Sequence, residues 1–452
     1  MILTHKKHTK LIDYPFWIAL ILFSNPGGIQ EALNIFEIYQ NINLNDFLFV
    51  FLMLCYFFSP KQYKQLHDYV YKKSVRFFIF FVFYYIVIFG ILTPAYNNTE
   101  YNSTLFVLIK MRYLIYSVGI FIFSYHFFNR SAHLFIKIFL ISSVAILSVF
   151  LISLIIGTEI LPYVKFSRGF VEIDRNYLHS YGLMPFLIPL GIVFLIFYNR
   201  NKTKYWAIIG FALMFITWVV SLTRRHILGT FIFLSLSLIL KQIADKKKIF
   251  PLSSVLKTLF YLVVVIFILN LTFPKYINAG IATFRETIHV IKFGESSSGQ
   301  KDERLGFSKK FIVDIYKKHP SFGTGFDNRW RSEGDELGYE SSDYPFLSAL
   351  AMSGIIGILV FLPIYLIIIR TLLYDFNYIR KNPIPYNLYY TPIFIGFFII
   401  QIYDIIQYFN WFLPISNPHR YDWFVQLAFY FAARKLFYNE ISSINNQVVH
   451  TI

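Results

Sequence analysis

The sequence has 452 residues, of which 56% are hydrophobic and 15% charged, and its formal net charge is +17. These values lie far from those of an average soluble domain and argue against a soluble globular fold. Apolar stretches of about 20 residues recur along the whole chain, which is typical of a polytopic helical membrane protein. By this length criterion we predict an all-α protein with about twelve transmembrane helices. They lie at approximately residues 14–30, 44–59, 77–95, 105–127, 134–157, 178–198, 205–222, 226–243, 254–273, 346–369, 388–408 and 423–438.

Lysine and arginine gather in every second loop, starting with Lys6 and Lys7 before the first predicted span. The positive-inside rule therefore places both termini in the cytoplasm and the intervening loops outside. We interpret the positive net charge as a membrane-anchoring signal and not as a sign of nucleic-acid binding. The first apolar run lacks a small-residue cleavage site, so we assign it to the series of spans and not to a signal peptide.

One long polar segment, 274–345, divides the chain into three parts. Residues 1–273 hold the first nine predicted spans, 274–345 form a large outer loop, and 346–452 hold the last three spans with a cytoplasmic tail. The single cysteine, Cys55, lies in an apolar run, so no intramolecular disulfide can form.

The large outer loop is predicted to contain two amphipathic helices. In the first, from 277 to 292, an apolar face and a basic stripe recur at helical spacing. The apolar face consists of Ile281, Phe284, Ile288 and Ile291, and the basic stripe of Arg285, His289 and Lys292. The second helix runs from about 302 to 318 and ends at His319-Pro320. A helix with such a stripe is expected to lie on the membrane surface or over a cleft.

The short turn between the seventh and eighth predicted spans contains two adjacent arginines, Arg224 and Arg225. Thr223 or Ser221 is expected to cap the new helix, which places both arginines in its first turn. The helix dipole disfavours cations there but favours an anion. Contacts with lipid headgroups or loop carboxylates are the alternative, and we favour a bound diphosphate because arginine offers bidentate phosphate geometry.

Two residues of the large loop are further candidates. Arg304 lies in the first turn of the second loop helix, where the sequence allows either ligand binding or an ion pair with Asp302 or Glu303. Asp343 precedes Tyr344-Pro345 at the start of the tenth predicted span. It is either a helix cap or a general base for a sugar hydroxyl, and the sequence leaves both open.

Weaker candidates lie at other predicted outer ends. Arg112, near the outer end of the fourth span, is read first as a side chain that reaches the interface and second as an anion contact. Arg168 belongs to the outer loop 158–177, which is basic although the positive-inside rule predicts few lysines and arginines in outer loops. The acidic residues between 327 and 343 fit no metal-binding spacing, so we predict a solvated loop without a metal site.

Three motifs in order carry a resemblance to a known family. They are Ser221-Leu222-Thr223-Arg224, then Arg304 followed by a helix and His319-Pro320-Ser321-Phe322-Gly323-Thr324-Gly325, and then Asp343-Tyr344, nine residues and Gly354-Ile355-Ile356-Gly357. With the twelve-span layout and the large loop between spans nine and ten, they make the chain resemble the O-antigen polymerase and O-antigen ligase superfamily of bacterial surface-polysaccharide assembly. The motifs occupy only about residues 210–370.

The resemblance implies a glycosyltransferase that acts on undecaprenyl-diphosphate-linked glycans at the periplasmic face of the bacterial inner membrane. It implies no nucleotide sugar, no cofactor and no required metal. By carry-over, Arg224 and Arg304 bind the donor diphosphate and take part in catalysis, and Asp343 activates the acceptor hydroxyl. We add Arg225 and Arg285 as diphosphate contacts on physical grounds, with Arg112, Arg168 and His289 as additional candidates. The expected partners are lipid-linked donor and acceptor glycans, membrane lipids and a protein that regulates chain length, without nucleic acid.

One departure from the family pattern separates two activities. The ligases carry a histidine where this chain has Asp343, so we favour a repeat-unit polymerase, with a ligase that transfers glycan to lipid A-core or protein as the alternative. A lipid-linked sugar flippase ranks lower, because the arginines lie at the outer boundary and no internal repeat is visible. In the late spans, Asp404 is the only acidic residue predicted well inside the membrane.

Overall fold

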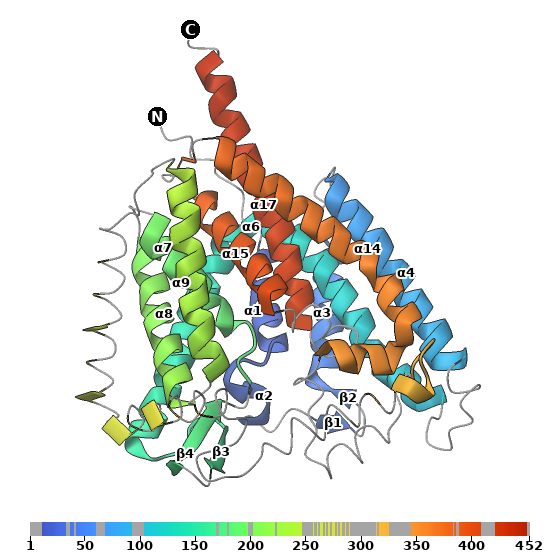
Figure 1. The fold of residues 1–452 in the computed structure, drawn as a ribbon, viewed down its shortest axis with the longest axis horizontal. Coiled ribbons are helices and arrows are strands. Elements are labelled where there is room, and N and C mark those ends of the chain that lie inside the picture. Colours follow the sequence, from blue (N-terminus) through green and yellow to red (C-terminus); the bar gives the residue numbers. More distant parts are fainter. Residues whose placement is uncertain are drawn as a thin grey trace.

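The computed structural model describes most of the membrane-spanning part of the chain. The described residues are 11–32, 37–39, 42–59, 68–92, 104–168, 171–178, 180–197, 202–221, 224–245, 316–324, 345–382, 384–385, 388–407 and 421–449, with scattered single residues and pairs between 256 and 313. They form a bundle of long helices with two small hairpins at one end (Figure 1).

Ten longer helices build the described bundle. They are α1 (Asp13–Phe23), α3 (Leu44–Phe57), α4 (Tyr69–Val87), α6 (Thr104–Ile156), α7 (Leu187–Phe197), α8 (Lys202–Val220), α9 (Arg224–Ala244), α14 (Pro345–Lys381), α15 (Tyr390–Gln407) and α17 (Tyr421–Val449). Short turns adjoin them: η1 (Pro26–Gly28), α2 (Ile29–Ala32), η3 (Ile88–Leu92) and η4 (Met184–Phe186). Among the described residues, four helices are long and apolar enough to cross a membrane, and four shorter ones are apolar too. The predicted all-α polytopic membrane fold is confirmed.

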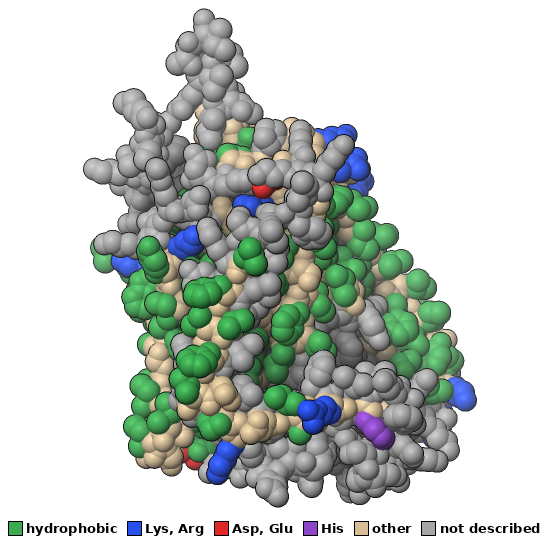
Figure 2. Space-filling view, turned by 60° about the vertical axis from the view of Figure 1, so that its left-hand side comes forward, with side chains coloured by type: hydrophobic (Ala, Val, Ile, Leu, Met, Phe, Trp, Pro, Cys, Tyr) green, Lys and Arg blue, Asp and Glu red, His purple; other side chains and the backbone are tan. Residues whose placement is uncertain are grey.

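The bundle has two edges, which we name by what they carry. The terminal edge holds the start of α1, a break in α6 at Ser131 and the end of α14 at Lys381. The strand edge holds the hairpins and the first residues of α3, α9, α14 and α17 (Figure 1). Between the edges, hydrophobic side chains cover the outer face, and lysine and arginine lie toward its two ends (Figure 2). This distribution fits a bilayer around the middle of the bundle.

α6 contains two of the predicted spans, joined by a break. Ser131 has φ −141° and ψ 39° inside an otherwise helical segment. Before the break, Phe127 stacks on Phe16 of α1, with ring centroids 3.6 Å apart. After it, Ile146 lies beside Gly27 at the other end of α1. The two arms of α6 therefore run in opposite directions along α1, as two predicted spans with a tight connection require.

α17 is the central helix of the bundle. From Trp423 to Ala433 nearly every side chain is buried, so no face of this stretch is left for lipid. Phe429 contacts Trp17, Phe128 and Phe397, which come from α1, α6 and α15. These aromatic contacts tie the first and last parts of the chain into one hydrophobic core.

The tenth predicted span ended too early. We predicted residues 346–369, with Arg370 in the following loop, but α14 continues to Lys381. The reason is that buried positions persist at helical spacing beyond the span, at Leu372, Asp375 and Ile379. The same stretch buries Asp375, so Asp404 is not the only acidic residue inside a late helix.

Two antiparallel hairpins at the strand edge were not predicted. They are formed by β1 (Glu37–Tyr39) with β2 (Ile42–Asn43) and by β3 (Tyr163–Arg168) with β4 (Val171–Leu178). The second lies where we expected only an outer loop. Its alternate residues Asn176 and Leu178 are buried, which shows that one face of the hairpin packs on the bundle.

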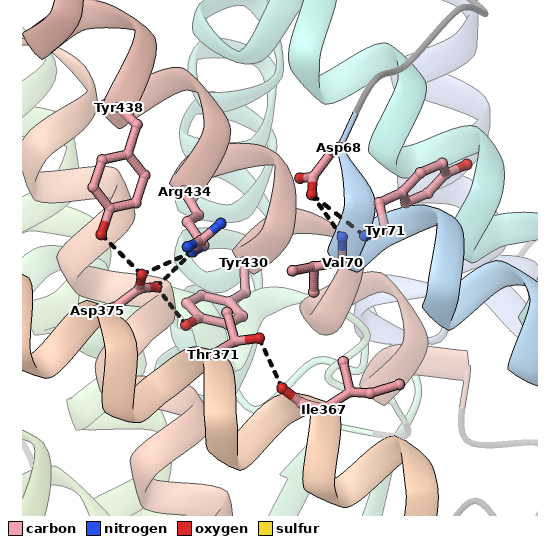
Figure 3. A network of polar contacts seen from close by, with 9 residues as sticks. All are labelled: Asp68, Val70, Tyr71, Ile367, Thr371, Asp375, Tyr430, Arg434 and Tyr438. Carbon is pink, nitrogen blue, oxygen red and sulfur yellow. Dashed lines mark hydrogen bonds and ion pairs between the residues drawn. The ribbon is translucent and has the colours of Figure 1, made fainter.

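A buried charge pair holds α14 against α17 near the terminal edge (Figure 3). Arg434 Nε donates to both carboxylate oxygens of Asp375, at 2.8 and 3.0 Å. Tyr430 and Tyr438 donate their hydroxyls to the same carboxylate, at 2.7 and 2.9 Å. The carboxylate of Asp375 is fully buried, so these donors replace the water that it loses in the folded protein.

A second buried charge pair joins α1 to α6 at the same edge. Arg130, beside the break in α6, donates to the carboxylate of Asp13 and, at 2.9 Å, to the hydroxyl of Ser59. The Ser59 hydroxyl also lies 2.8 Å from Nε2 of His126. All four side chains are buried. The terminal edge is therefore fastened at two places by charges that are matched inside the protein.

We expect Arg434→Ala to destabilise the protein strongly, because it leaves the Asp375 carboxylate buried without its cation. Loss of one partner of a buried pair costs about 3–5 kcal/mol. Thermal unfolding of the detergent-purified protein measures the effect. Arg380→Ala, which removes an exposed arginine near the end of the same helix α14, is the matched control and should unfold like the parent. Equal unfolding temperatures for both variants would contradict the assigned role of the pair.

Candidate functional site

The predicted arginine pair lies at the start of a helix on the strand edge. α8 ends at Val220, and the buried Ser221 turns its hydroxyl to the Trp218 carbonyl, at 2.9 Å. α9 begins at Arg224, so Arg224 and Arg225 occupy its first two positions, as predicted. Their side chains lie outside the described part of the chain. The free N–H groups and the dipole of such a helix start favour a bound anion.

His226, the next residue of α9, is fixed by aromatic neighbours. Its ring stacks on Trp218 with centroids 4.6 Å apart and an interplanar angle of 18°. The Tyr181 ring meets it edge-on at 6.2 Å. We had not singled out His226, and only its position directly after the arginine pair could have drawn attention to it. The stacking fixes the first turn of α9 on the end of α8 and on the segment after β4.

The segment after β4 is in turn fixed on the end of α1. The amide of Gly27 donates to the Ser180 carbonyl at 2.7 Å. A Cβ on Gly182 would lie 2.5 Å from the carbonyl oxygen of Ser24, so only glycine allows this approach. Asn25, with φ 48°, ends α1 and accepts a hydrogen bond from the Gln30 amide at 2.9 Å. The helix-breaking residues Asn25–Gly28 therefore end α1 and support the corner that carries Arg224.

α9 also packs closely on α15, one to two turns from the arginine pair. A Cβ on Gly229 would overlap the hydroxyl of Tyr403, whose ring packs on Phe233 at 4.2 Å. The next residue of α15, Asp404, is buried and accepts a hydrogen bond from the side-chain amide of Gln426 in α17. The start of α9 is therefore set by contacts with α8, α15 and the segment after β4.

The second and third family-like motifs meet at a break in α14. Gly354 has φ 61° and ψ −175°, which separates a half-helix, Pro345–Ser353, from the rest of α14. The turn 319–324 lies across this break. Helical conformation before the turn ends at Lys318, as predicted from His319-Pro320. Two motifs that are separate in sequence thus form one local structure.

Backbone hydrogen bonds join the turn to both sides of the break. The Thr324 amide donates to the Ala351 carbonyl of the half-helix at 3.1 Å. From the other side, the amides of Ile355 and Ile356 donate to the carbonyls of Pro320 and Ser321, at 3.0 and 3.1 Å. The turn therefore supplies partners for groups that the helix break would leave without them. We call this arrangement the turn–helix lock.

Two glycines make the turn–helix lock sterically possible. Gly323 and Gly354 both have positive φ, 70° and 61°. A Cβ on Gly323 would overlap the Met352 carbonyl and lie 2.6 Å from the Ser353 nitrogen. A Cβ on Gly354 would overlap the Ser321 carbonyl in the same way. Both motif glycines are thus explained by backbone conformation and by close approach of two backbones.

Arg112, one of the additional candidates, is held in an internal network. Its guanidinium lies 3.4 Å from the Asp46 carboxylate and donates to the Tyr113 hydroxyl at 2.9 Å. Tyr116 donates to the same carboxylate, and Asp46 completes a capping box with Asn43 at the start of α3. Arg112 therefore has a structural partner, which favours a role in fastening α3 to α6 at the strand edge.

The remaining candidates are spread over the strand edge and the large loop. Arg168 ends β3 and pairs with Val171. Arg285 is helical and exposed, and His289 is helical and half-buried. We placed Ile281 on a different face from Arg285, and this was wrong, because a spacing of four puts both on one face and both are exposed. Arg304 and Asp343 lie outside the described residues, and Asp343 precedes the first residue of α14 by two positions.

Among the described residues, no group of three or more histidine, cysteine, aspartate or glutamate side chains could hold a metal ion. The chemistry that the described strand edge offers consists of a helix start with two arginines, the turn–helix lock and the adjoining hairpin β3–β4. Of these, the helix start with its arginines is suited to binding an anionic ligand by charge and hydrogen bonding.

Comparison with known families shows a similarity in this part of the chain. Residues 209–362 match the model of the O-antigen ligase family. The match includes the start of α9, the turn–helix lock and the sequence between them, and it confirms the predicted resemblance to the O-antigen polymerase and ligase superfamily. At the level of the family it supports glycosyl transfer by a membrane protein, without separating polymerase from ligase. Comparison with curated proteins gave no match.

We expect Gly229→Ala to disturb the packing that positions the start of α9. The added methyl group overlaps the Tyr403 hydroxyl, and overpacking of this kind costs about 1–3 kcal/mol. Adding Tyr403→Phe should restore part of the loss, because the nearest ring carbon, Cζ, then lies 3.1 Å from the new Cβ. Thermal unfolding of both variants and of Tyr403→Phe alone measures this. An unchanged unfolding temperature for Gly229→Ala would show that the α9–α15 contact is loose.

Proposed function

We propose that the protein is a glycosyltransferase that polymerises undecaprenyl-diphosphate-linked oligosaccharide repeat units at the strand edge. One observation carries the proposal. The first residues of α9, with Arg224 and Arg225, and the turn–helix lock belong to the same family-matched stretch and lie at the same edge of the bundle (Figure 1). A cationic helix start at the same edge as a locked loop end is suited to a lipid diphosphate substrate that enters from the membrane.

The donor diphosphate is assigned to the start of α9. An anion at this position gains the free N–H groups and the dipole of the helix, and it explains two arginines where the dipole alone disfavours cations. Arg304 is assigned to the same diphosphate by the resemblance, and Arg285 is the further contact from the large loop. The exposed side chain of Arg285 is compatible with this role.

The acceptor hydroxyl is assigned to Asp343. α14 begins at Pro345, a residue suited to the first helical position, and Asp343 precedes it by two residues in the sequence. From there its carboxylate can take the proton of a sugar hydroxyl, provided that the site raises its proton affinity. We keep helix capping as the competing role for this side chain.

The proposed reaction is a substitution at the anomeric carbon of the donor. The acceptor hydroxyl oxygen forms a bond to this carbon, and the bond from the carbon to the diphosphate oxygen breaks. The proton of the hydroxyl passes to Asp343, and the diphosphate leaves with the bonding electrons. Arg224, Arg225 and Arg304 stabilise the negative charge that develops on it. Because diphosphate is a good leaving group, positioning and charge stabilisation account for most of the rate.

Orientation in the membrane follows from the cations at the terminal edge. Described residues at or near this edge include Lys72, Lys73, Arg76, Lys241, Arg380 and Lys381. By the positive-inside rule this edge faces the cytoplasm, so the strand edge faces the periplasm of a bacterium. The bacterial inner membrane is then the expected location.

An O-antigen ligase is the alternative within the same family. The matched family model carries the ligase description, which favours this alternative. Asp343 at the position where ligases carry histidine favours the polymerase. The two activities use the same kind of donor and differ in the acceptor, so the start of α9 would serve either one.

A flippase ranks below both enzymes for a structural reason. Transporters use broken helices whose free ends face a substrate or an ion near the middle of the membrane. α14 is broken, but the break lies only nine residues from its start, at the strand edge. The freed amides of Ile355 and Ile356 bond to the turn 319–324, which leaves them no role in holding cargo.

Reconstitution separates these functions. Purified protein in lipid vesicles is supplied with one defined undecaprenyl-diphosphate-linked repeat unit, and the products are separated by size. We expect chains of several repeats to form without any other acceptor. Products that appear only after addition of lipid A-core would identify a ligase, and movement of the lipid across the membrane without glycan growth would identify a flippase.

Arg224→Ala and Arg304→Ala should each lower polymer formation by about 100-fold or more, because each removes positive charge from the leaving diphosphate. Membrane insertion and yield should stay unchanged. Arg76→Ala, which removes an exposed arginine at the terminal edge, is the control and should retain full activity. Normal polymer from both site variants would refute this assignment of the diphosphate contacts.

A further inference from the structure

We propose that His226 is a substrate-binding residue: its ring, held at the start of α9 between Trp218 and Tyr181, binds a phosphate group of the lipid diphosphate in its protonated form. The proposal rests on the proposed function, because that function makes a diphosphate the anion at this helix start. It adds a contact that changes with pH, which the two preceding arginines cannot supply because arginine stays protonated.

The position of the His226 ring follows from the geometry of the helix. α9 begins at Arg224 and has 21 residues, so His226 is its third residue and belongs to the turn with free N–H groups. A helical side chain leans back toward the N-terminus, so the His226 ring lies over the helix start. The side chain is half-buried, so part of it stays within reach of a ligand at the strand edge.

Two aromatic rings hold the His226 ring in place. Trp218 of α8 stacks on it almost in parallel, with centroids 4.6 Å apart and an interplanar angle of 18°. Tyr181 meets it edge-on at 6.2 Å. An imidazolium at this distance over the face of an indole makes a favourable cation–π contact. The stack therefore accommodates the charged ring while an anion is bound.

Trp218 supplies a second observation at the same place. Its side chain is only 3% exposed, and its Nε1–H has no acceptor among the described residues. A buried donor without an acceptor costs free energy. Because the indole lies against the His226 ring, a phosphate bound by His226 offers the acceptor that this donor lacks.

Few charged or titratable groups surround His226 in the described part of the chain. α7, the last three turns of α8 and the strand-edge part of α14 contain no charged residue. The groups on the neighbouring elements are Tyr181, Arg224, Arg225 and Asp404, the last of which is turned toward Gln426 of α17. Histidine is the group that ordinarily changes charge near about pH 6.5, so a change in anion binding between pH 6 and pH 8 is assigned to His226.

The test is a calorimetric titration of the purified protein in detergent with farnesyl diphosphate, a short lipid diphosphate, at pH 6 and pH 8. His226→Phe keeps a ring that stacks on Trp218 but carries no charge, so it separates anion binding from packing. At pH 6 we expect the parent to bind about 10-fold more tightly than this variant, because the variant lacks a charge-assisted hydrogen bond. At pH 8, where histidine is mostly neutral, the two affinities should differ by less than about twofold.

Two further variants are compared in the same way. His133→Phe changes a half-buried histidine near the break in α6, at the terminal edge, and should bind like the parent at both pH values. Trp218→Phe removes an N–H that does not titrate, and it should weaken binding by about threefold or more at both pH values. Thermal unfolding checks that each variant is folded, and His226→Gln replaces His226→Phe if the latter is not.

Three results would overturn the proposal. An equal pH dependence of binding in the parent and in the His226 variant would show that His226 only packs on Trp218. Absence of binding by the parent would show that this helix start holds no diphosphate. Displacement of farnesyl diphosphate by an equal concentration of phosphatidylglycerol would show that the site takes phospholipid headgroups.

Chain growth in vesicles separates this proposal from the proposed function. If both hold, His226→Phe slows chain growth by about 10-fold at pH 6 and by less than about twofold at pH 8. A parent protein that binds farnesyl diphosphate with the expected pH dependence but extends no chain would refute the polymerase, while the assignment of His226 to a diphosphate would stand.

Discussion

Backbone polar groups inside or beside a bilayer need partners from the protein, and the break in α14 shows how this chain meets that demand. The reversal at Gly354 interrupts the helical hydrogen bonds of a membrane-spanning helix. The turn 319–324 restores them from both sides, so a loop segment becomes part of the helix end. Among the described residues of the large loop, the turn 319–324 is held on the bundle by those few bonds.

At the terminal edge, buried ion pairs hold the helices together, whereas at the strand edge backbone hydrogen bonds hold the turn 319–324 on α14. Asp375 with Arg434 and Asp13 with Arg130 are buried pairs between helices that are distant in sequence. Each charge is matched inside the protein, so these pairs fix α14 on α17 and α1 on α6. The long part of α14 is thereby held at one end by charge and at the other by the turn–helix lock.

Local sequence signals predicted the elements better than their contacts. Apolar length indicated the spans, Asn25-Pro26-Gly27-Gly28 indicated the end of α1, and the cap residues before Arg224 indicated the start of α9. The break at Gly354 was not predicted, because a glycine in a helical pattern is ordinarily tolerated, and its positive φ has a cause only when Ser321 lies against it. The pairing of Asp375 with Arg434 was missed for the same reason, since periodicity describes one helix at a time. Arg304 and Asp343 stay predictions from the family-like motifs.

Under the proposed function, the separation of the two anchoring points has a chemical reason. Donor and acceptor both carry a lipid diphosphate, so one shared cluster of cations would let them compete for the same contacts. The proposed assignment of the donor diphosphate to the arginines and of the acceptor hydroxyl to Asp343 avoids this competition. The helices α9 and α14 then need a fixed relation, which the packing of Gly229 on Tyr403 and the buried core around α17 supply. Diphosphate is already a good leaving group, so the reaction needs no strongly reactive side chain. It needs a protein that holds its two substrates rigidly in place.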